Sequence, residues 1–599
     1  MTEAKTVPER SELDENSKWN LAPLYEAVEE WTEEFNSIES KLEMIGEYRG
    51  RLEVSNSIIA DCLRSQDELS RKLERVYTWS HLKHDEDLRD TAYQTLHDKA
   101  VNLAVRIEAE SSYIIPELLM LPEERLSELM SDPVLEFARV PLRSILRQKE
   151  HFLSPEEERL LALADEALES SSKIYRMLND ADLTFPTVVD ESGGEVELSH
   201  GRFVGMLLSR DRRVRRDTLE RFYTSYGSHR NTFTAILEGE LKKRAFKAMI
   251  RKYSSALEAS LDNDEVKPDL YNGLIDAVRS SFPSFYEYVD LRKRALDLDE
   301  LHMYDVYTPL VKEYERKVEW DEARNIVLEA VSPLGEMYQE IVEDGLSRRW
   351  IDVYENRGKR SGAYSSGCYD SPPYILMNYD GNVKEVFTLA HEMGHSIHSY
   401  LSNKNQPHIT ADYRIFVAEV ASTVNEVLLL GYLKKKWTSK EEQTYLVNHH
   451  LESFKGTVYR QTMFAEFERD ICSMVEANQP LTPDILGEHY GKLNRDYFGP
   501  GMIIDREIEL EWARIPHFYY NFYVYKYATS FSVANAIATR ILDGDKEQLD
   551  AYIDLLKAGS SKPPVELLKD AGVDLSTPAP ISEALDVFAG LVKEMDGLI

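Results

Sequence analysis

The residues best placed for chemistry are His391, Glu392 and His395, which lie in the segment HEMGH. On a helix, histidines four residues apart project from one face, so both imidazoles can bind a single metal ion. Glu392 stands beside the first histidine and can act as general base toward a water on that ion. The motif therefore predicts a zinc-dependent peptidase, while a charged helix with two unliganded histidines is the alternative that it leaves open.

The third ligand of the predicted zinc site has to come from outside this motif. A catalytic zinc usually has three protein ligands and one open position. The extended metzincin pattern requires Gly at 398 and His at 401, whereas this chain has His398 and Leu401. Glu419 lies in an otherwise apolar stretch, residues 415–428, where a carboxylate is unfavourable unless a cation accompanies it. We therefore predict that Glu419, on a second helix, is the third ligand.

Glu426 follows Glu419 by seven residues and falls on the same helical face. From that position it can accept a hydrogen bond from the outer nitrogen of a ligand histidine, which would orient the imidazole. An ordinary solvated helix residue is a nearly equal interpretation.

A second group of reactive side chains lies in the aromatic stretch 515–528. If this stretch begins a helix, His517, Tyr520, Val524 and Tyr527 share one face at spacings of three, four and three. The imidazole and the phenols could donate hydrogen bonds to an oxyanion near the metal. Plain aromatic core packing is the alternative, and the metal motif makes us favour the catalytic interpretation.

A Gly-, Ser- and Tyr-rich island at 361–379 precedes the metal motif, and we interpret it as β-structure. A strand containing Gly362, Ala363 and Tyr364 could bind an extended peptide by strand addition, through main-chain hydrogen bonds that ignore side chains. A purely structural hairpin is equally compatible with the pattern.

The elements that must position these residues are mostly helices. Apolar residues recur at three- and four-residue spacing from 21 to 170, and again after a β-hairpin predicted within 181–198. Asn382, followed by Glu385, has the form of a capping box that opens the metal helix. We expect a mainly α fold with a small β-sheet next to the active-site helix. An N-terminal helical domain, 1–198, should precede a catalytic domain, 199–599.

The composition indicates which partners and which cellular compartment to expect for the protein. The net charge is −35 over 599 residues, which makes a nucleic acid an unlikely partner because phosphates require a basic surface. Cys62, Cys368 and Cys472 are odd in number and form no CxxC pair, which argues for a reducing compartment. The N-terminus has no apolar stretch and no run is long enough to span a bilayer. We predict a cytoplasmic protein without a membrane partner.

These motifs together resemble the thimet oligopeptidase family of zinc peptidases, family M3, and within it the oligoendopeptidase F branch. The resemblance extends over nearly the whole chain. It is carried by HEMGH, by a glutamate 28 residues after its first histidine, and by four further segments: Trp19–Leu21, Asn179–Pro186, Lys359–Ser365 and His517–Tyr527.

The resemblance implies a two-lobed helical fold with a deep central channel that admits short, unfolded peptides and excludes folded proteins. It implies one Zn²⁺ per chain and a match of Tyr520 and Tyr527 to the tyrosine pair of the family. The ligand spacing is also close to that of angiotensin-converting-enzyme-like peptidases, but the matches over the whole chain favour the first family. A dipeptidyl carboxypeptidase and a peptide-binding scaffold without turnover are the competing hypotheses, and a monomer and a dimer are both open.

Overall fold

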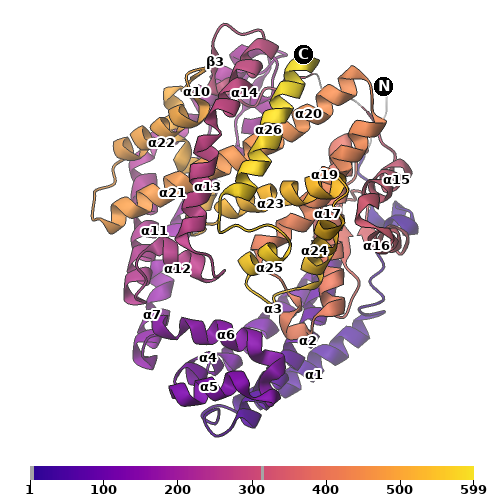
Figure 1. Cartoon of the computed structure of the whole chain (residues 1–599), viewed down its shortest axis with the longest axis vertical. Coiled ribbons are helices and arrows are strands. Elements are labelled where there is room, and N and C mark those ends of the chain that lie inside the picture. The colour runs from indigo at the N-terminus through magenta and orange to yellow at the C-terminus, as the bar shows by residue number, and fades with distance from the viewer. Residues whose placement is uncertain (1–5, 312–313, 315) are drawn as a thin grey trace. The chain divides into compact units, whose positions relative to one another are not determined.

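The structure, a computed structural model, describes residues 6–311, 314 and 316–599, and most of them are helical (Figure 1). This confirms the mainly α fold that we predicted. The first five residues of the N-terminal segment, for which we expected no targeting signal, lie outside the described residues. All three cysteines are free and buried.

The chain forms two compact units that alternate along the sequence. Unit 1 comprises Met1–Phe152, Glu315–Leu433 and Ile537–Val573, and unit 2 comprises Leu153–Tyr314, Lys434–Ala536 and Asp574–Ile599. Both units are discontinuous in sequence. The predicted domain boundary at 198/199 divides the chain into two consecutive parts, whereas each compact unit combines three separate segments. The boundary stays a prediction.

Unit 1 holds fourteen α-helical segments among the described residues, two of which are shared with unit 2. They are α1 (Val28–Gly46), α2 (Asn56–Glu86), α3 (Thr91–Ser111), α4 (Ile114–Leu119), α5 (Glu123–Ser131), α6 (Arg139–Arg147), α15 (Trp320–Ala330), α16 (Glu336–Ser347), α17 (Val383–Asn405), α18 (His408–Ala411), most of α19 (Ile415–Lys436), α24 (Lys546–Lys557) and α25 (Pro564–Asp570); the end of α23 (Tyr525–Leu542) also belongs here.

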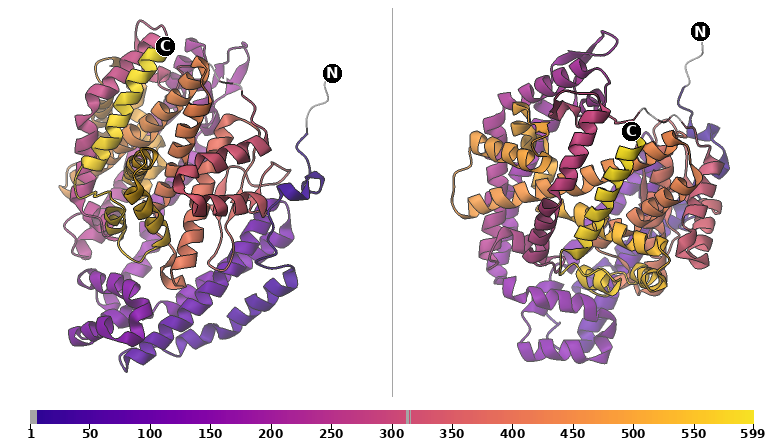
Figure 2. Two further views of the ribbon diagram at one scale, coloured as in Figure 1. Left: turned by 45° about the vertical axis from the view of Figure 1, so that its right-hand side comes forward. Right: turned by 45° about the horizontal axis from the view of Figure 1, so that its top comes forward.

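The N-terminal helices of unit 1 pack against its small sheet. The helices α1, α2 and α3 lie side by side (Figure 2), and the indole of Trp31 donates to the carbonyl of Val76 at 2.8 Å. The hydrophobic core that they form continues to Tyr374 and Leu376, which are fully buried on a strand of the sheet. The first helices of the chain therefore support the strands that precede the metal motif.

The sheet of unit 1 has three short strands, β4 (Ile351–Asp352), β5 (Tyr364–Ser366) and β6 (Tyr374–Leu376), in the order β4-β6-β5. β5 and β6 are antiparallel, and β5 is an edge strand. This confirms the β-structure expected at 361–379. The parallel partner β4 was not predicted, because two residues are too few to show an alternating pattern.

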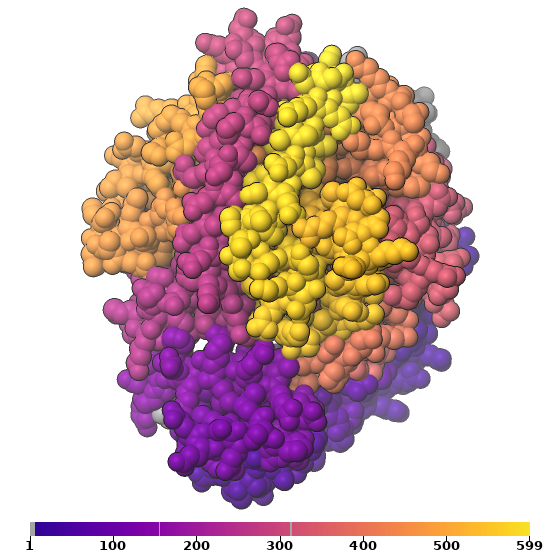
Figure 3. Space-filling view, in the orientation of Figure 1, coloured from indigo at the N-terminus to yellow at the C-terminus, as the bar shows by residue number. Residues whose placement is uncertain are grey.

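The helix α17 carries the HEMGH motif and lies between the sheet and other helices of unit 1. It contacts β5 and β6 as well as α15, α16, α18 and α24. The helices α24 and α25 form part of the outer surface (Figure 3). The start of α17 is as predicted, with the side chain of Asn382 accepting from the Glu385 N–H at 2.9 Å. The return half of the predicted capping box is not formed, because the Asn382 N–H donates to Asp380 at 3.1 Å.

The helix α19 is apolar around most of its circumference. By length and composition alone it could cross a membrane, so our prediction that no run is long enough was wrong on that criterion. However, 72% of the relevant window is buried inside the protein. A helix that is apolar all round and buried by its own protein is typical of a core helix. It carries both acidic residues that we assigned to the metal site.

Unit 2 is also helical. Its helices are α7 (Pro155–Leu168), α8 (Ser170–Arg176), α9 (His200–Leu207), α10 (Arg212–Ser228), α11 (Arg230–Ile250), α12 (Ala256–Asp262), α13 (Pro268–Ser280), α14 (Phe282–Ala295), α20 (Lys440–Phe454), α21 (Arg460–Glu476), α22 (Pro483–Phe498), the start of α23 and α26 (Ala579–Leu598). The hairpin predicted within 181–198 is confirmed as β1 (Thr187–Val189) paired with β2 (Glu195–Glu197). The parallel pair β3 (Leu301–His302) and β7 (Met502–Ile503) was not predicted.

Candidate metal centre and active site

Three side chains of unit 1 converge as a possible metal site: His391 and His395 from α17, and Glu419 from α19. The Nε2 atoms of the two histidines are 3.2 Å apart. Each lies 3.6 Å from Oε2 of Glu419. In a tetrahedral zinc site, two ligand atoms about 2.1 Å from the ion lie about 3.4 Å from each other. The spacing of these three atoms therefore fits a zinc ion bound by two imidazoles and one carboxylate.

Neighbouring groups orient each of the three side chains. Nδ1 of His391 is 2.5 Å from Oε1 of Glu426. A hydrogen bond involving the Ala418 backbone holds His395, and the Ser422 hydroxyl donates to Oε2 of Glu419 at 3.1 Å. Such partners fix the orientation of metal ligands. Glu426 is thus hydrogen-bonded to a histidine rather than turned to solvent, which is the first of the two interpretations left open by the sequence.

The protonation of the two histidines differs. Burial lowers the pKa of His395 to about 4, and the nearby His391 adds to this effect, so His395 is neutral and able to bind a metal. Burial acts in the same direction on His391, but Glu426 outweighs it and raises the pKa of His391 to about 9. Metal binding at His391 therefore has to displace a proton.

Glu392 lies next to the three converging side chains and is only 8% exposed. Burial raises the pKa of its carboxyl, while His391 acts to lower it. Its carboxylate accepts a hydrogen bond from the backbone N–H of Ser365, in the middle of β5. The candidate base is therefore tied directly to the edge strand.

The close crossing of α17 and α19 depends on residues that the sequence analysis did not single out. A Cβ atom at Gly394 would lie 2.6 Å from the Ala421 carbonyl oxygen, so only glycine lets the two helices approach this closely. Nearby, the buried Asn425 donates to the carbonyl of Ala390 at 3.1 Å. The signals were present in the sequence, since both a glycine inside a helix and an asparagine in an apolar stretch indicate a specific contact.

The strand predicted to bind substrate is the edge strand β5, which begins at Tyr364; Gly362 and Ala363 lie just before it. The Ser365 hydroxyl is 2.8 Å from that of Ser396 on α17. The Tyr364 hydroxyl donates at 2.8 Å to Asp85, a carboxylate of α2 that is only 2% exposed. The strand is thus fixed to the metal helix on one side and to the N-terminal helices on the other.

The aromatic stretch 515–528 of unit 2 does not form the helix start that we predicted. Residues Pro516–Tyr519 form a short 3₁₀ helix, and α23 begins only at Tyr525. Between them Asn521 and Phe522 have positive φ angles of 53° and 58°, which interrupts the helical path. The spacing of three, four and three therefore does not place these residues on one helical face.

The predicted side chains of this stretch nevertheless gather in unit 2. The ring centroid of His517 is 5.5 Å from that of Tyr520 and 6.1 Å from that of Tyr527. Tyr520 is 55% exposed, whereas Val524 is fully buried and takes no part in the cluster. Burial lowers the pKa of His517, so its imidazole is neutral near pH 7. A turn of the chain, and not one face of a helix as we predicted, therefore brings His517, Tyr520 and Tyr527 together.

Comparison with known proteins identifies the family. A sequence profile of Peptidase family M3 matches residues 205–587, and one of Oligopeptidase F matches residues 117–185. The chain belongs to peptidase family M3. The unmatched interval between the two profiles contains the domain boundary predicted at 198/199.

The chain is similar in sequence to its relatives over nearly its whole length. It is 44% identical to oligopeptidase PepF of Bacillus subtilis, over the whole of this chain and 89% of that one. It is 37% identical to group B oligopeptidase PepB of Streptococcus agalactiae, over 98% of each chain. Among solved structures, a putative peptidase from Chlamydophila abortus matches with a TM-score of 0.95 at 36% identity, covering 99% of this chain and 100% of that one. Oligoendopeptidase-F from Enterococcus faecium matches with a TM-score of 0.74 at 38% identity, covering 95% and 99%.

These matches confirm the resemblance inferred from the motifs and the mainly helical fold. They support a peptidase that acts on oligopeptides. Peptidases of this family are metallopeptidases, and the three converging side chains of α17 and α19 provide a possible metal site.

Proposed function

We propose that the protein is a zinc-dependent endopeptidase that hydrolyses internal bonds of short, unfolded oligopeptides. The observation that carries this proposal is the spacing of 3.2–3.6 Å among the ligand atoms of His391, His395 and Glu419. Two imidazoles with one carboxylate are a ligand set of catalytic zinc, which leaves a fourth position for water or substrate. One ion per chain is expected.

Glu392 is the proposed general base. When bound, zinc lowers the pKa of a coordinated water and polarises a carbonyl oxygen. Glu392 accepts the proton of the attacking water and then delivers it to the departing amine. A carboxyl whose pKa is raised by burial is better suited to both steps than an exposed one, because proton transfer is most effective near the working pH.

The substrate is proposed to pair with β5 in an extended conformation, next to Gly362, Ala363 and Tyr364. An edge strand has one side that no other strand pairs with, and main-chain hydrogen bonds accept many sequences. The hydrogen bond between the Ser365 N–H and Glu392 supports this placement, since it brings the strand to the base. Only an unfolded segment can add to the strand, which agrees with short peptides as substrates.

His517, Tyr520 and Tyr527 are proposed to stabilise the oxyanion of the tetrahedral intermediate. The clustering of the three side chains within unit 2, and the match of Tyr520 and Tyr527 to the tyrosine pair of the family, support the assignment. We further propose the central channel between the lobes, the 198/199 domain boundary and a cytoplasmic location, on the same resemblance. The acidic charge of −35 supports the absence of a nucleic-acid partner.

The test of the function combines hydrolysis of an end-blocked, quenched fluorescent peptide with zinc analysis. Glu392→Gln should keep zinc and lower kcat by at least a hundredfold, because it removes the proton carrier. His391→Ala and Glu419→Ala should instead lose the metal. Glu385→Gln, on the first turn of the same helix and outside the site, is the matched control and should resemble the wild type.

Two results would contradict the proposal. Near-normal turnover by the Glu392→Gln variant would exclude Glu392 as the base, and full zinc occupancy in the Glu419→Ala variant would exclude the ligand set. The end-blocked peptide also separates the competing hypotheses. A dipeptidyl carboxypeptidase requires a free C-terminus and would leave it intact, and a scaffold protein would show no hydrolysis that a chelator suppresses.

A further inference from the structure

A cavity of about 520 Å³ lies within unit 1 beside the edge strand β5. Its wall includes Ser366 and Gly367 at the end of this strand, and Ala418, the residue before the proposed ligand Glu419. The remaining wall comes from the segment after β5, from the C-terminal half of α17, from α18 and the residues that follow it up to Ile415, and from Glu74 of α2. The cavity therefore borders both the proposed substrate strand and the proposed metal site.

The position of the cavity along β5 relates it to the bond being cleaved. The Ser365 N–H donates to Glu392, so Ser365 lies level with the base. The cavity begins one residue later, at Ser366. Because a strand rises about 3.3 Å per residue, a peptide paired with β5 would present to this cavity a side chain one or two positions from the scissile bond.

The walls of the cavity combine polar groups with an apolar and aromatic part. They include Ala411, Ile415, Pro373 and the ring of Tyr413. Tyr413 is held rigidly, because its hydroxyl lies 2.8 Å from that of Ser399 and its ring stacks on His398 with centroids 3.6 Å apart. The cavity can therefore accept the methylene groups of a long side chain.

The charges at the cavity are mostly acidic. Asp412 and Glu74 line it, and His408 is the cation among the lining residues. His408 is already engaged, since its two ring nitrogens lie 2.6 Å from Asp67 and 2.9 Å from Glu74. Among the hydrogen bonds and ion pairs of the described residues, the Asp412 carboxylate has only the N–H of Tyr413, at 2.9 Å. The exposed Arg414 follows in sequence but does not line the cavity.

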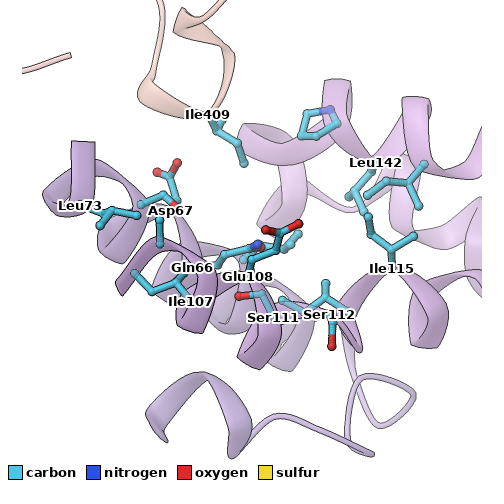
Figure 4. A pocket seen from close by; sticks show the side chains of 16 residues that line it. Gln66, Asp67, Leu73, Ile107, Glu108, Ser111, Ser112, Ile115, Leu142 and Ile409 are labelled. Carbon is cyan, nitrogen blue, oxygen red and sulfur yellow. The ribbon is translucent and has the colours of Figure 1, made fainter. Parts of the chain in front are cut away.

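The short helix α18 also borders a second cavity, of about 620 Å³, through Ile409. Figure 4 shows Ile409 above side chains of α2 and α3, such as Ile107 and Gln66. Asp67 lines this second cavity, and its carboxylate is bonded to His408. Of the two carboxylates that line the first cavity, that of Asp412 therefore has no ion pair within 4 Å among the described residues, although the charges of Arg414 and His408 act on it from farther away.

We infer that the cavity beside β5 is a subsite for a long basic side chain, lysine or arginine, of the peptide substrate, with Asp412 determining the preference. This inference rests on the proposed peptidase function. The methylene stem of such a residue would lie along Ile415 and Tyr413 while its cation reaches the carboxylate at the rim. A hydrogen bond between ions is stronger than one between neutral groups. A basic side chain should therefore be preferred over an uncharged side chain of similar length.

The experiment uses end-blocked, quenched peptides that differ at one position, which carries lysine, arginine, norleucine or glutamate. The varied position is moved through the two residues on each side of the cleaved bond. At one of these positions the value of kcat/KM should be about tenfold higher for lysine and arginine than for norleucine, and lowest for glutamate. Asp412→Asn should reduce the ratio of lysine to norleucine toward one.

The control variant is Asp321→Asn, which removes the same charge from an 88% exposed side chain of α15. It should leave the ratio of lysine to norleucine unchanged, because it alters only the net charge. A ratio near one in the wild type, or a ratio that Asp412→Asn does not change, would overturn the subsite. Hydrolysis of the norleucine peptide distinguishes these outcomes from a failure of the proposed function, because in that case no peptide of the series would be cleaved.

Discussion

The two regions that carry the proposed chemistry, the α17–α19 pair of unit 1 and the aromatic segment 515–527 of unit 2, are built in different ways. In the first, helical periodicity places His391 and His395 on one face of α17, and a second continuous helix, α19, presents Glu419 to them. In the second, the chain turns through Asn521 and Phe522 in left-handed conformations before α23 begins. The first region is regular, and its precision comes from one close crossing of two helices.

The aromatic segment depends on distant residues of unit 2. The N–H of Phe522 donates to Glu468 at 2.8 Å, and Arg244 donates to Glu468 and to the carbonyl of Phe518, each at 2.6 Å. Glu468 and Arg244 are both buried. A positive φ at a phenylalanine persists only where surrounding contacts over-determine the backbone. The ion pair between Arg244 and Glu468 therefore fixes the backbone of the aromatic segment at a point where it is not helical.

The strongest test of the regular region is Gly394→Ala. The added Cβ would lie 2.6 Å from the Ala421 carbonyl oxygen and 2.7 Å from Cα of Ser422, so α17 and α19 would have to separate. We expect loss of most bound zinc and at least a hundredfold loss of kcat/KM, together with a destabilisation of about 1–3 kcal/mol from overpacking. Zinc analysis and thermal unfolding are the measurements.

Gly590→Ala on α26 is the matched control, because no atom lies within 4 Å of a Cβ built there. In a helix, alanine is more stable than glycine by up to about 1 kcal/mol, so this variant should be as stable as the wild type or more so. If the Gly394→Ala variant kept its zinc and its activity, the close crossing would not be what sets the metal site.

The corresponding test of the aromatic segment is Tyr527→Phe. If its hydroxyl donates to the oxyanion, its removal should lower kcat by about a hundredfold, the usual cost of one such donor. Zinc content and thermal stability should stay unchanged. Tyr523→Phe is the control, because this ring lies 5.2 Å from that of Tyr527 and loses the same atom. Equal kcat values for the two variants would remove Tyr527 from the proposed mechanism.

The contrast between the regions also explains what the sequence could predict. The start of α19 at Ile415, the cap of α17 at Asn382 and the convergence on Glu419 follow from local periodicity and spacing, which act over a few residues. The turn at Asn521 and Phe522 could not be predicted, because its backbone is fixed by Arg244 and Glu468, far away in sequence. Two-residue strands such as β4 and the alternation of the two units along the chain leave no periodic signal either.

Glu468→Gln tests whether the ion pair positions the aromatic segment. Glu468 and Glu240 both pair with Arg244, so removing the charge of Glu468 leaves this buried guanidinium with less compensation and should destabilise unit 2 by up to about 3 kcal/mol. If the pair also positions the oxyanion donors, kcat should fall about tenfold at constant zinc content, through a shift of the segment. Asp305→Asn is the control, because Asp305 is a buried carboxylate of unit 2 that pairs with Arg215 at 2.6 Å. A similar loss of stability with an equal loss of kcat in both variants would make the effect of Glu468 purely structural.

The smallest predicted effect is a change in how thermal stability depends on pH. Burial acts to lower the pKa of His408 in α18, but its hydrogen bonds to Asp67 and Glu74 outweigh this and raise the pKa to about 9. A folded pKa above the unfolded value of about 6.5 means that this stabilisation is complete below pH 6.5 and is lost as the pH rises through 9. The difference in Tm between the wild type and His408→Asn should therefore be largest near pH 6 and shrink by pH 9.5.

His517 should behave in the opposite way, because burial lowers its pKa. A folded pKa below the unfolded value means that acid favours the unfolded chain, so the stability supported by neutral His517 is lost as the pH falls below about 6.5. Relative to the His517→Asn variant, the wild type should lose Tm on acidification and keep it at pH 9. Measuring Tm for both variants across the same pH range assigns alkaline loss to the contacts of α18 and acid loss to the aromatic segment. Parallel profiles for the two variants would contradict both assignments.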